Sequence, residues 1–293
     1  MKNNRNRMMT EEKIREYCVW LEQCERSRET IQKYEYCLLQ FMSFMEDRPV
    51  GKDMVIMWKS LLRDKLAPVT INGAIAALNG FFKYCRWDDC KTRFLKITKN
   101  TFCPESRELS KQEYKRLVQT AMEHGNERLA LLLETICSSG IRVSELPFIT
   151  VSAALKGQAE VDCKGRIRTV LLTKKLCQML QEYANRKGIK EGMIFVTRNG
   201  KALDRSNVWR EMKKLGQEAK VGSEKIFPHN LRHLFARTYY SMTMDITKLA
   251  DILGHRDINT TRIYTIESGS KHRENLESME LILPLYNRIS ILL

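Results

Sequence analysis

The chain has 293 residues, 43% of them hydrophobic, and is therefore long enough for two domains that each bury a core. Its 50 lysines and arginines exceed its 35 aspartates and glutamates, giving a net charge of +15 that favours a polyanionic partner, nucleic acid ahead of an anionic membrane surface. No run approaches the roughly 20 apolar residues that span a bilayer, and the N-terminus lacks the apolar core of a signal peptide, so we expect a cytoplasmic protein.

Residues 1–90 show helical periodicity throughout. Two stripes of apolar residues recur every three or four positions: Ile31, Tyr34, Leu38, Phe41 and Met45 in the first, and Ile71, Ile75, Leu78 and Phe82 in the second. Ser27 is a candidate N-cap for the first of these helices. The runs "EKIREYCVWL" and "DMVIMWKSLLRD" predict two more helices. We therefore predict a bundle of about four helices whose stripes form a core.

Residues 91–107 have no clear period and are predicted to be a linker. Ser110 followed by Glu113 is a capping box that opens a new helix and with it a second domain, 108–293. An apolar helix, "RLALLLETICSSG", comes next, and then the β-rich segment "AEVDCKGRIRTVLLT". Its alternating residues predict a hairpin that turns at Lys164 and Gly165. Several helices follow, so the predicted fold class is mainly α with one small β-hairpin.

Three pairs of polar residues in the second domain are candidates for a site. Arg142 has Glu145 three residues later, close enough on a helical turn to orient the guanidinium, although a surface ion pair is the simpler interpretation. His229 and Arg232 share one face of a helix and could grip one anion, while a capped histidine beside a surface arginine is an equal alternative. His255 and Tyr264 lie nine residues apart in the polar stretch "GHRDINTTRIYT".

Taken together, these segments resemble the tyrosine recombinase family over nearly the whole chain. The family's four motifs occur in order as "SGIRVSEL", "CKGRIRTVLL", "HNLRHLFA" and "LGHRDINTTRIYT". By this resemblance the catalytic positions are occupied by Arg142, Lys164, His229, Arg232, His255 and Tyr264, with Glu145 at the supporting acidic position. Two departures are visible: Leu234 replaces a small hydroxyl residue, and the lysine hairpin is short. The resemblance also implies a DNA-binding role for the helical domain 1–90, which would be SAM-like.

The resemblance implies a reaction as well. Tyr264 would attack the DNA backbone to form a 3′-phosphotyrosine, with His229 as the base and Lys164 protonating the leaving oxygen. Arg142, Arg232 and His255 would supply the positive charge that the phosphoryl transition state needs. Rejoining would then need neither ATP nor a metal, and we expect no cofactor. Nine cysteines without a C-x-x-C pair indicate neither a disulfide framework nor a zinc site, and we expect them to be small buried hydrophobes.

The expected partner is double-stranded DNA with inverted-repeat sites, bound by a homotetramer on paired sites. The apolar residues Leu276, Met279, Leu281 and Ile282 follow a polar hinge at Gly269, and this tail could dock on a neighbouring protomer or on its own domain. Three alternatives remain: a type IB topoisomerase that relaxes DNA as a monomer, a DNA-binding protein without strand exchange, and a membrane-surface protein. Tyr239, Tyr240, His124 and His233 are expected to be structural.

Overall fold

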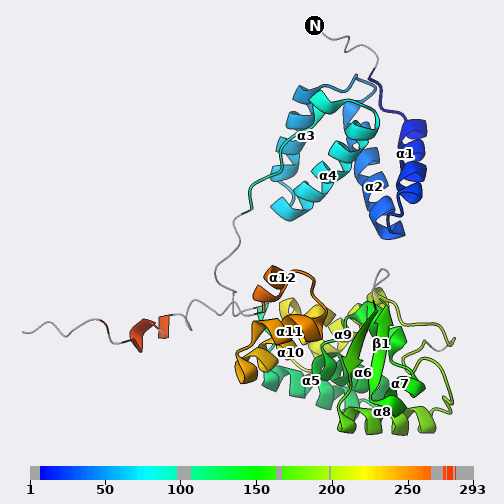
Figure 1. Ribbon diagram of the computed structural model, residues 1–293, viewed down its shortest axis with the longest axis vertical. Helices are drawn as coiled ribbons and strands as arrows, with labels where there is room; N and C mark the ends of the chain where they lie inside the picture. Colours follow the sequence, from blue (N-terminus) through cyan, green and yellow to red (C-terminus); the bar gives the residue numbers. More distant parts are fainter. Residues whose placement is uncertain are drawn as a thin grey trace, which may run out of the picture. The chain divides into compact units, whose positions relative to one another are not determined.

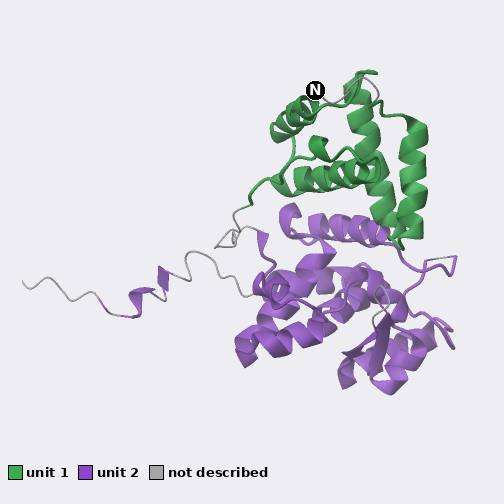
Figure 2. Cartoon of the chain, turned by 45° about the horizontal axis from the view of Figure 1, so that its top comes forward, with its two compact units in different colours: residues 1–99 green, residues 100–293 purple. Residues whose placement is uncertain are grey.

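The protein was analysed as a computed structural model, which describes residues 7–97, 107–162, 167–197, 199–264, 273–274, 276–279 and 281. The chain forms two compact units, residues 1–99 and 100–293 (Figure 2). Both are mainly helical, and the second contains one antiparallel pair of strands, as predicted for the fold class.

The described residues of the first unit form four helices, labelled in Figure 1, and one short 3₁₀ turn. They are α1 (Glu11–Gln23), α2 (Arg28–Met45), α3 (Lys52–Arg63), α4 (Pro68–Tyr84) and η2 (Asp88–Cys90). The predicted bundle is confirmed, and so are its two stripes, since all of their residues are buried except Tyr34, which is half-buried. Ser27 does occupy the N-cap position of α2, but its hydroxyl contacts that of Thr30 instead of a backbone N–H group.

The segment that follows this bundle is tied to α4 over its first residues. The Asn79 side chain accepts a hydrogen bond from the Thr92 N–H group and donates one to its carbonyl, at 3.0 and 2.9 Å. Asn72 pairs with Leu95 in the same way, at 2.7 and 2.9 Å. The sequence predicted a linker from residue 91 onward. In the structure the two asparagines form hydrogen bonds with the backbone N–H and carbonyl groups of Thr92 and Leu95, so the first unit extends beyond its last helix.

The second unit surrounds the apolar helix α6. Its elements are α5 (Lys111–Glu123), α6 (Glu127–Ser139), η4 (Val143–Phe148), α7 (Val151–Lys156), β1 (Gln158–Asp162), β2 (Ile167–Leu171), α8 (Lys174–Arg186), α9 (Arg205–Glu218), η5 (Ser223–Lys225), α10 (Pro228–Thr243), α11 (Ile246–Leu253) and α12 (Ile258–Arg262). Helix α6 contacts α5, α8 and α10, which explains why its residues 129–133 are all buried and why no polar stripe interrupts its sequence. The predicted capping box of Ser110 and Glu113 opens α5.

The predicted hairpin is present, with Val161 opposite Arg168 and Asp162 opposite Ile167. Its strands are joined by residues 163–166, and the predicted turn at Lys164 and Gly165 lies outside the described residues. On β2 the apolar residues Ile167 and Leu171 face solvent, whereas Arg168 and Val170 point toward the protein. The inward face of this strand therefore carries a charged residue, Arg168, beside the buried Val170, while two of its apolar residues face solvent.

The described cysteines are all free thiols. Cys18, Cys90 and Cys177 are buried, as expected for small apolar side chains, and three others are half-buried. The expectation is wrong for Cys24, which is exposed because it lies at the C-cap of α1, where the chain turns at the surface.

Candidate active site

Arg142 is held in place immediately after α6. The helix ends at Gly140, whose φ of +65° is the left-handed conformation that glycine tolerates, and a Cβ atom there would lie 2.5 Å from the Phe235 ring. The Glu145 carboxylate then accepts hydrogen bonds from both the backbone N–H and the guanidinium of Arg142, each at 2.8 Å. Glu145 is only 1% exposed, so the pair is not the surface ion pair that the sequence allowed.

Glu145 has a second basic partner that the sequence did not suggest. Arg168 on β2 donates a hydrogen bond from Nη2 to Glu145 Oε2 at 2.6 Å. Burial alone would raise the pKa of the Glu145 carboxyl, but the hydrogen bonds from Arg168 and from the Arg142 backbone hold that pKa below its usual value. Glu145 is therefore an anion at neutral pH, and it orients Arg142 with a full negative charge.

Helix α10 carries His229 and Arg232, which lie on one face as predicted. Arg232 is 1% exposed and donates to the carbonyls of Gly140 and Leu253, the latter at 2.8 Å. Its Nε–H group is buried and has no partner within the described protein. Burial, followed by the charge of Arg142, lowers the Arg232 pKa to about 10, which leaves it a cation at neutral pH.

His255 follows the end of α11, where Gly254 adopts a φ of +64°. Its Nε2 atom lies 3.0 Å from Arg232 Nη2, and its Nδ1 atom lies 2.8 Å from the Thr261 hydroxyl. Because arginine can only donate, Nε2 must accept, so the proton of the neutral ring is on Nδ1. Burial and then the charges of Arg232 and Arg142 lower the His255 pKa to about 4. In the absence of a bound anion the ring is thus uncharged at neutral pH.

Tyr264 is buried, with 2% of its surface exposed. Its hydroxyl is 3.5 Å from His229 Nε2, at the outer limit of a hydrogen bond. The ring of His255 is stacked on that of Tyr264 with centroids 5.7 Å apart, and the ring of His233 meets it edge-on at 4.6 Å. His233, which the sequence left as a structural residue, thus packs against the ring of Tyr264, and its position next to Arg232 on α10 was the available signal.

His229 is an exposed residue, yet the pKa of its imidazole is lowered. Neighbouring protein atoms displace water from the ring, and the positive charges of Arg232, Arg142 and Arg205 add to that effect. His229 is consequently neutral near pH 7 and can accept a proton. The direction of its shift suits a general base, because a base must be unprotonated at the working pH.

A cavity of about 630 Å³ is lined by three of these residues, Arg142, His229 and Arg232. Its walls are formed by Ile141, Arg142, Val143, Ser144, Arg205, Trp209, Phe227, Pro228, His229 and Arg232. Arg205 and Trp209 come from the first turns of α9 and were not predicted from the sequence, since neither belongs to a recognisable motif. The cavity therefore presents three arginines and a neutral histidine to whatever enters it.

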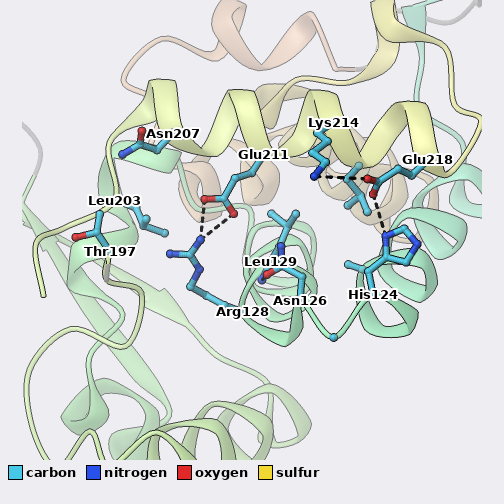
Figure 3. A pocket seen from close by; sticks show the side chains of 13 residues that line it. His124, Asn126, Arg128, Leu129, Thr197, Leu203, Asn207, Glu211, Lys214 and Glu218 are labelled. Carbon is cyan, nitrogen blue, oxygen red and sulfur yellow. Dashed lines mark hydrogen bonds and ion pairs between the residues drawn. The ribbon is translucent and has the colours of Figure 1, made fainter. Parts of the chain in front are cut away.

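A second cavity, of about 600 Å³, lies between α9 and the turn that joins α5 to α6 (Figure 3). Here the charges are paired with each other: Arg128 with Glu211 at 2.7 Å, and His124 with Glu218 at 3.0 Å (Figure 3). His124 thus has the structural role expected of it. The two cavities differ in that only the first contains a buried arginine, Arg232, that pairs with no carboxylate within the described chain.

Of the predicted catalytic residues, the structure brings together Arg142, His229, Arg232, His255 and Tyr264. Lys164 lies outside the described residues. Tyr239 and Tyr240 are half-buried and pack beside α11, in agreement with their expected structural role. No cluster of three or more histidine, cysteine or acidic side chains suitable for a metal ion occurs in the part of the chain that is described. Nor does any described helix have the length and apolarity needed to cross a membrane.

Comparisons with protein families cover most of the chain. Residues 107–270 match the model of the phage integrase family, and residues 14–89 match that of the phage integrase N-terminal SAM-like domain. Tyrosine recombinase XerA of Pyrococcus furiosus is 27% identical, with 95% of this chain and 97% of the relative covered. Tyrosine recombinase XerD of Oceanobacillus iheyensis is 26% identical, with 86% and 92% covered.

Solved structures show the same fold. The crystal structure of XerA recombinase has 25% identity and a TM-score of 0.52, covering 93% of this chain and 99% of that one. A lambda integrase dimer bound to a COC' core site has 17% identity and a TM-score of 0.72, covering 88% and 95%. The post-cleavage complex of XerH recombinase with its palindromic difH substrate has 20% identity and a TM-score of 0.70, covering 94% and 91%.

Proposed function

The chain belongs to the phage integrase family of tyrosine recombinases, and we propose that it cleaves DNA with Arg142, Lys164, His229, Arg232, His255 and Tyr264. Members of this family are site-specific recombinases, which break and rejoin DNA strands, and the chain is such an enzyme. Glu145 is the supporting acid in this proposal. A topoisomerase or a DNA-binding protein without strand exchange is not favoured by its relatives.

One observation carries the assignment of the site. Arg232 is a buried cation that pairs with no carboxylate among the described residues, and it lies beside the equally buried Tyr264 and the neutral His229. Burying an unpaired charge costs free energy unless a counter-ion completes the site. A DNA phosphate would supply that counter-ion and would bring its phosphorus atom to the tyrosine hydroxyl.

In the proposed reaction, His229 takes the proton of the Tyr264 hydroxyl, because a hydroxyl group is a weak nucleophile until a base removes its proton. The tyrosine oxygen forms a bond to phosphorus, and the bond from phosphorus to the 5′ oxygen breaks. Lys164 gives a proton to that leaving oxygen, so that a 3′-phosphotyrosine and a free 5′-hydroxyl result. Arg142 and Arg232 stabilise the charge that develops on the non-bridging oxygens. Rejoining reverses each step without an external energy source.

His255 would change its role when the phosphate binds. Without an anion it accepts a hydrogen bond from Arg232 and is neutral. A phosphate offsets the repulsion from Arg232 and Arg142 that helps to lower the His255 pKa, so protonation becomes easier. A protonated His255 has a second N–H group, on Nε2, which could then donate to a phosphate oxygen.

The structural relatives named above include recombinases bound to DNA. We extend this to the present chain: residues 1–90 would grip double-stranded DNA, 91–107 would link the domains, and 108–293 would carry the catalysis. A homotetramer on paired inverted-repeat sites in the cytoplasm would then exchange the strands. The described tail residues Leu276, Met279 and Leu281 are 67%, 55% and 76% exposed, which supports burial of the tail against another surface during assembly.

Replacing the nucleophile tests the proposal. Tyr264→Phe removes only the hydroxyl and should abolish the covalent protein–DNA adduct on a nicked suicide substrate, as read on a denaturing gel, while DNA affinity is retained. Tyr240→Phe is the matched control, because Tyr240 is a neighbouring half-buried tyrosine that packs beside α11. An adduct of normal yield from Tyr264→Phe would assign the nucleophile to another residue.

A further inference from the structure

Arg168 on β2 connects two parts of the proposed active site that are far apart in the sequence. Its Nη2 atom donates to Glu145 Oε2 at 2.6 Å, and its Nη1 atom donates to the carbonyl oxygen of Ile252 at 2.7 Å. The side chain is 14% exposed and that of Glu145 is 2% exposed. A single guanidinium therefore bridges the carboxylate that orients Arg142 and the last turn of α11.

The second of these contacts fixes the end of a helix. The last carbonyls of a helix have no partner within it, and a cation at this end is favoured by the helix dipole. In α11 two arginines satisfy adjacent carbonyls: Arg168 takes that of Ile252 and Arg232 takes that of Leu253. The chain then passes through Gly254 directly into His255, so the position of this helix end sets the position of the imidazole.

The packing around Gly254 shows that space is kept for the Arg168 side chain. A Cβ atom on Gly254 would lie 2.4 Å from Arg168 Cδ, and the φ of +64° at this glycine already disfavours any other residue. The stem of Arg168 thus lies directly against the turn that precedes His255. The same strand begins three residues after Lys164 in the sequence, so the arginine also anchors the strand that carries the lysine hairpin.

We propose that Arg168 is a positioning residue for DNA cleavage. It fixes the position of Glu145, and of its partner Arg142, relative to the end of α11 that leads into His255. The planar fork of arginine suits this role, since its two Nη atoms reach two different oxygen acceptors at once. Arg168 does not line the cavity formed by Arg142, His229 and Arg232, so it acts through those residues and not on the DNA. This inference rests on the proposed active site.

A matched control exists at the second cavity. Arg128 on α6 also bridges a carboxylate and a carbonyl. Its Nη2 atom donates to Glu211 at 2.7 Å (Figure 3), and its Nη1 atom donates to the carbonyl oxygen of Val196 at 2.9 Å. Its side chain is 26% exposed. Arg128 lines the second cavity, whose walls include none of the proposed catalytic residues. Its removal should reduce stability through the same kinds of bonds without disturbing catalysis.

The test compares Arg168→Met with Arg128→Met in three measurements: melting temperature, DNA affinity by fluorescence anisotropy, and the single-turnover cleavage rate of a suicide substrate at saturating protein. We expect both variants to melt earlier. Only Arg168→Met should cleave slowly, by about 10- to 100-fold, since a misplacement of catalytic groups by about 1 Å has an effect of that size. Its DNA affinity should stay within about threefold of the wild type, because the arginines of the cavity remain. Wild-type cleavage by Arg168→Met, or an equal loss of rate in Arg128→Met, would overturn the inference.

A double-mutant cycle separates positioning from general damage. If Arg168 acts through Glu145, its replacement should slow Glu145→Gln much less than it slows the wild type, because residues of one network are not additive. Equal slowing in both backgrounds would count against the inference. If Arg168→Met does not fold, Arg168→Lys is compared with the wild type instead: it keeps the charge but not the fork, and should cleave more slowly than the wild type at a similar DNA affinity. A wild-type cleavage rate in a folded Arg168→Lys would then overturn the inference.

The outcome for Tyr264→Phe keeps this inference distinct from the assignment of the active site. A normal adduct from Tyr264→Phe removes the active-site proposal and the inference together. No adduct from Tyr264→Phe, combined with normal cleavage by Arg168→Met, removes only the role of Arg168.

Discussion

Replacing Arg232 by methionine removes a buried guanidinium while keeping most of the volume of its side chain. Three of its five N–H groups are engaged in the free protein, by the carbonyls of Gly140 and Leu253 and by His255. The guanidinium also interacts with the Tyr264 hydroxyl, and the buried Nε–H group, which has no partner in the described structure, remains for a phosphate. The loss of one such donor slows a reaction roughly 10²- to 10³-fold, so Arg232→Met should slow cleavage by at least that factor.

The assay is the single-turnover rate of adduct formation on a nicked suicide substrate, measured at saturating protein so that binding does not limit it. The melting temperature of the variant serves as the control for folding. This control is needed because the substitution leaves two buried carbonyls without donors, at a cost of about 1–3 kcal/mol each. The removal of a desolvated charge offsets part of this cost. The rate is compared at a temperature where both proteins are folded.

The size of the effect decides whether Arg232 has the assigned role. A folded Arg232→Met variant that loses less than about tenfold in rate would refute the argument, since even one lost donor should cost more. The cleavage rate of Arg232→Lys should lie between those of the wild type and Arg232→Met. An ammonium keeps the charge, but it cannot hold both carbonyls in the same geometry while contacting phosphate.

Four further predictions test other parts of the mechanism. Because the pKa of His229 is lowered in the protein without DNA, the cleavage rate at subsaturating protein, which reports the free enzyme, should not begin to fall until the pH is below about 6.5; a fall that begins above pH 7 would contradict its role as base. The pKa values of His255 and His233 are lowered to about 4 and about 3, so the unfolded chain binds more protons below about pH 6.5. The free energy of unfolding, measured by chemical denaturation, should therefore be independent of these rings above that pH and decrease from about pH 6.5 toward 4, and His233→Gln should weaken the decrease. Cleavage should survive excess EDTA, since Arg142 and Arg232 supply the positive charge; loss in EDTA with recovery in magnesium would contradict this. Deletion of the residues after Ser270 should leave single-site binding and some cleavage but abolish recombination between two sites, which a gel assay of recombinant products would detect.

The sequence alone predicted the elements whose signal is local. The helices of residues 1–90 follow from apolar residues at every third or fourth position, and the start of α5 follows from Ser110 and Glu113, whose partners lie three residues apart. The candidate site was also found from the sequence, because four motifs occur in the order of a known family. Two of its pairs, Arg142 with Glu145 and His229 with Arg232, are close in space since they lie one helical turn apart.

The tertiary structure alone determined the charge states and the network around these residues. His255 is neutral because burial and two arginines from distant segments lower its pKa, which no pattern near residue 255 could indicate. In the sequence Arg168 is one of several basic residues in the hairpin segment. In the structure it donates hydrogen bonds to Glu145, 23 residues away in the sequence, and to Ile252, 84 residues away. Such contacts depend on how β2 and α11 pack together, and the sequence periodicity of an element shows which face is buried but not which partner will lie against it.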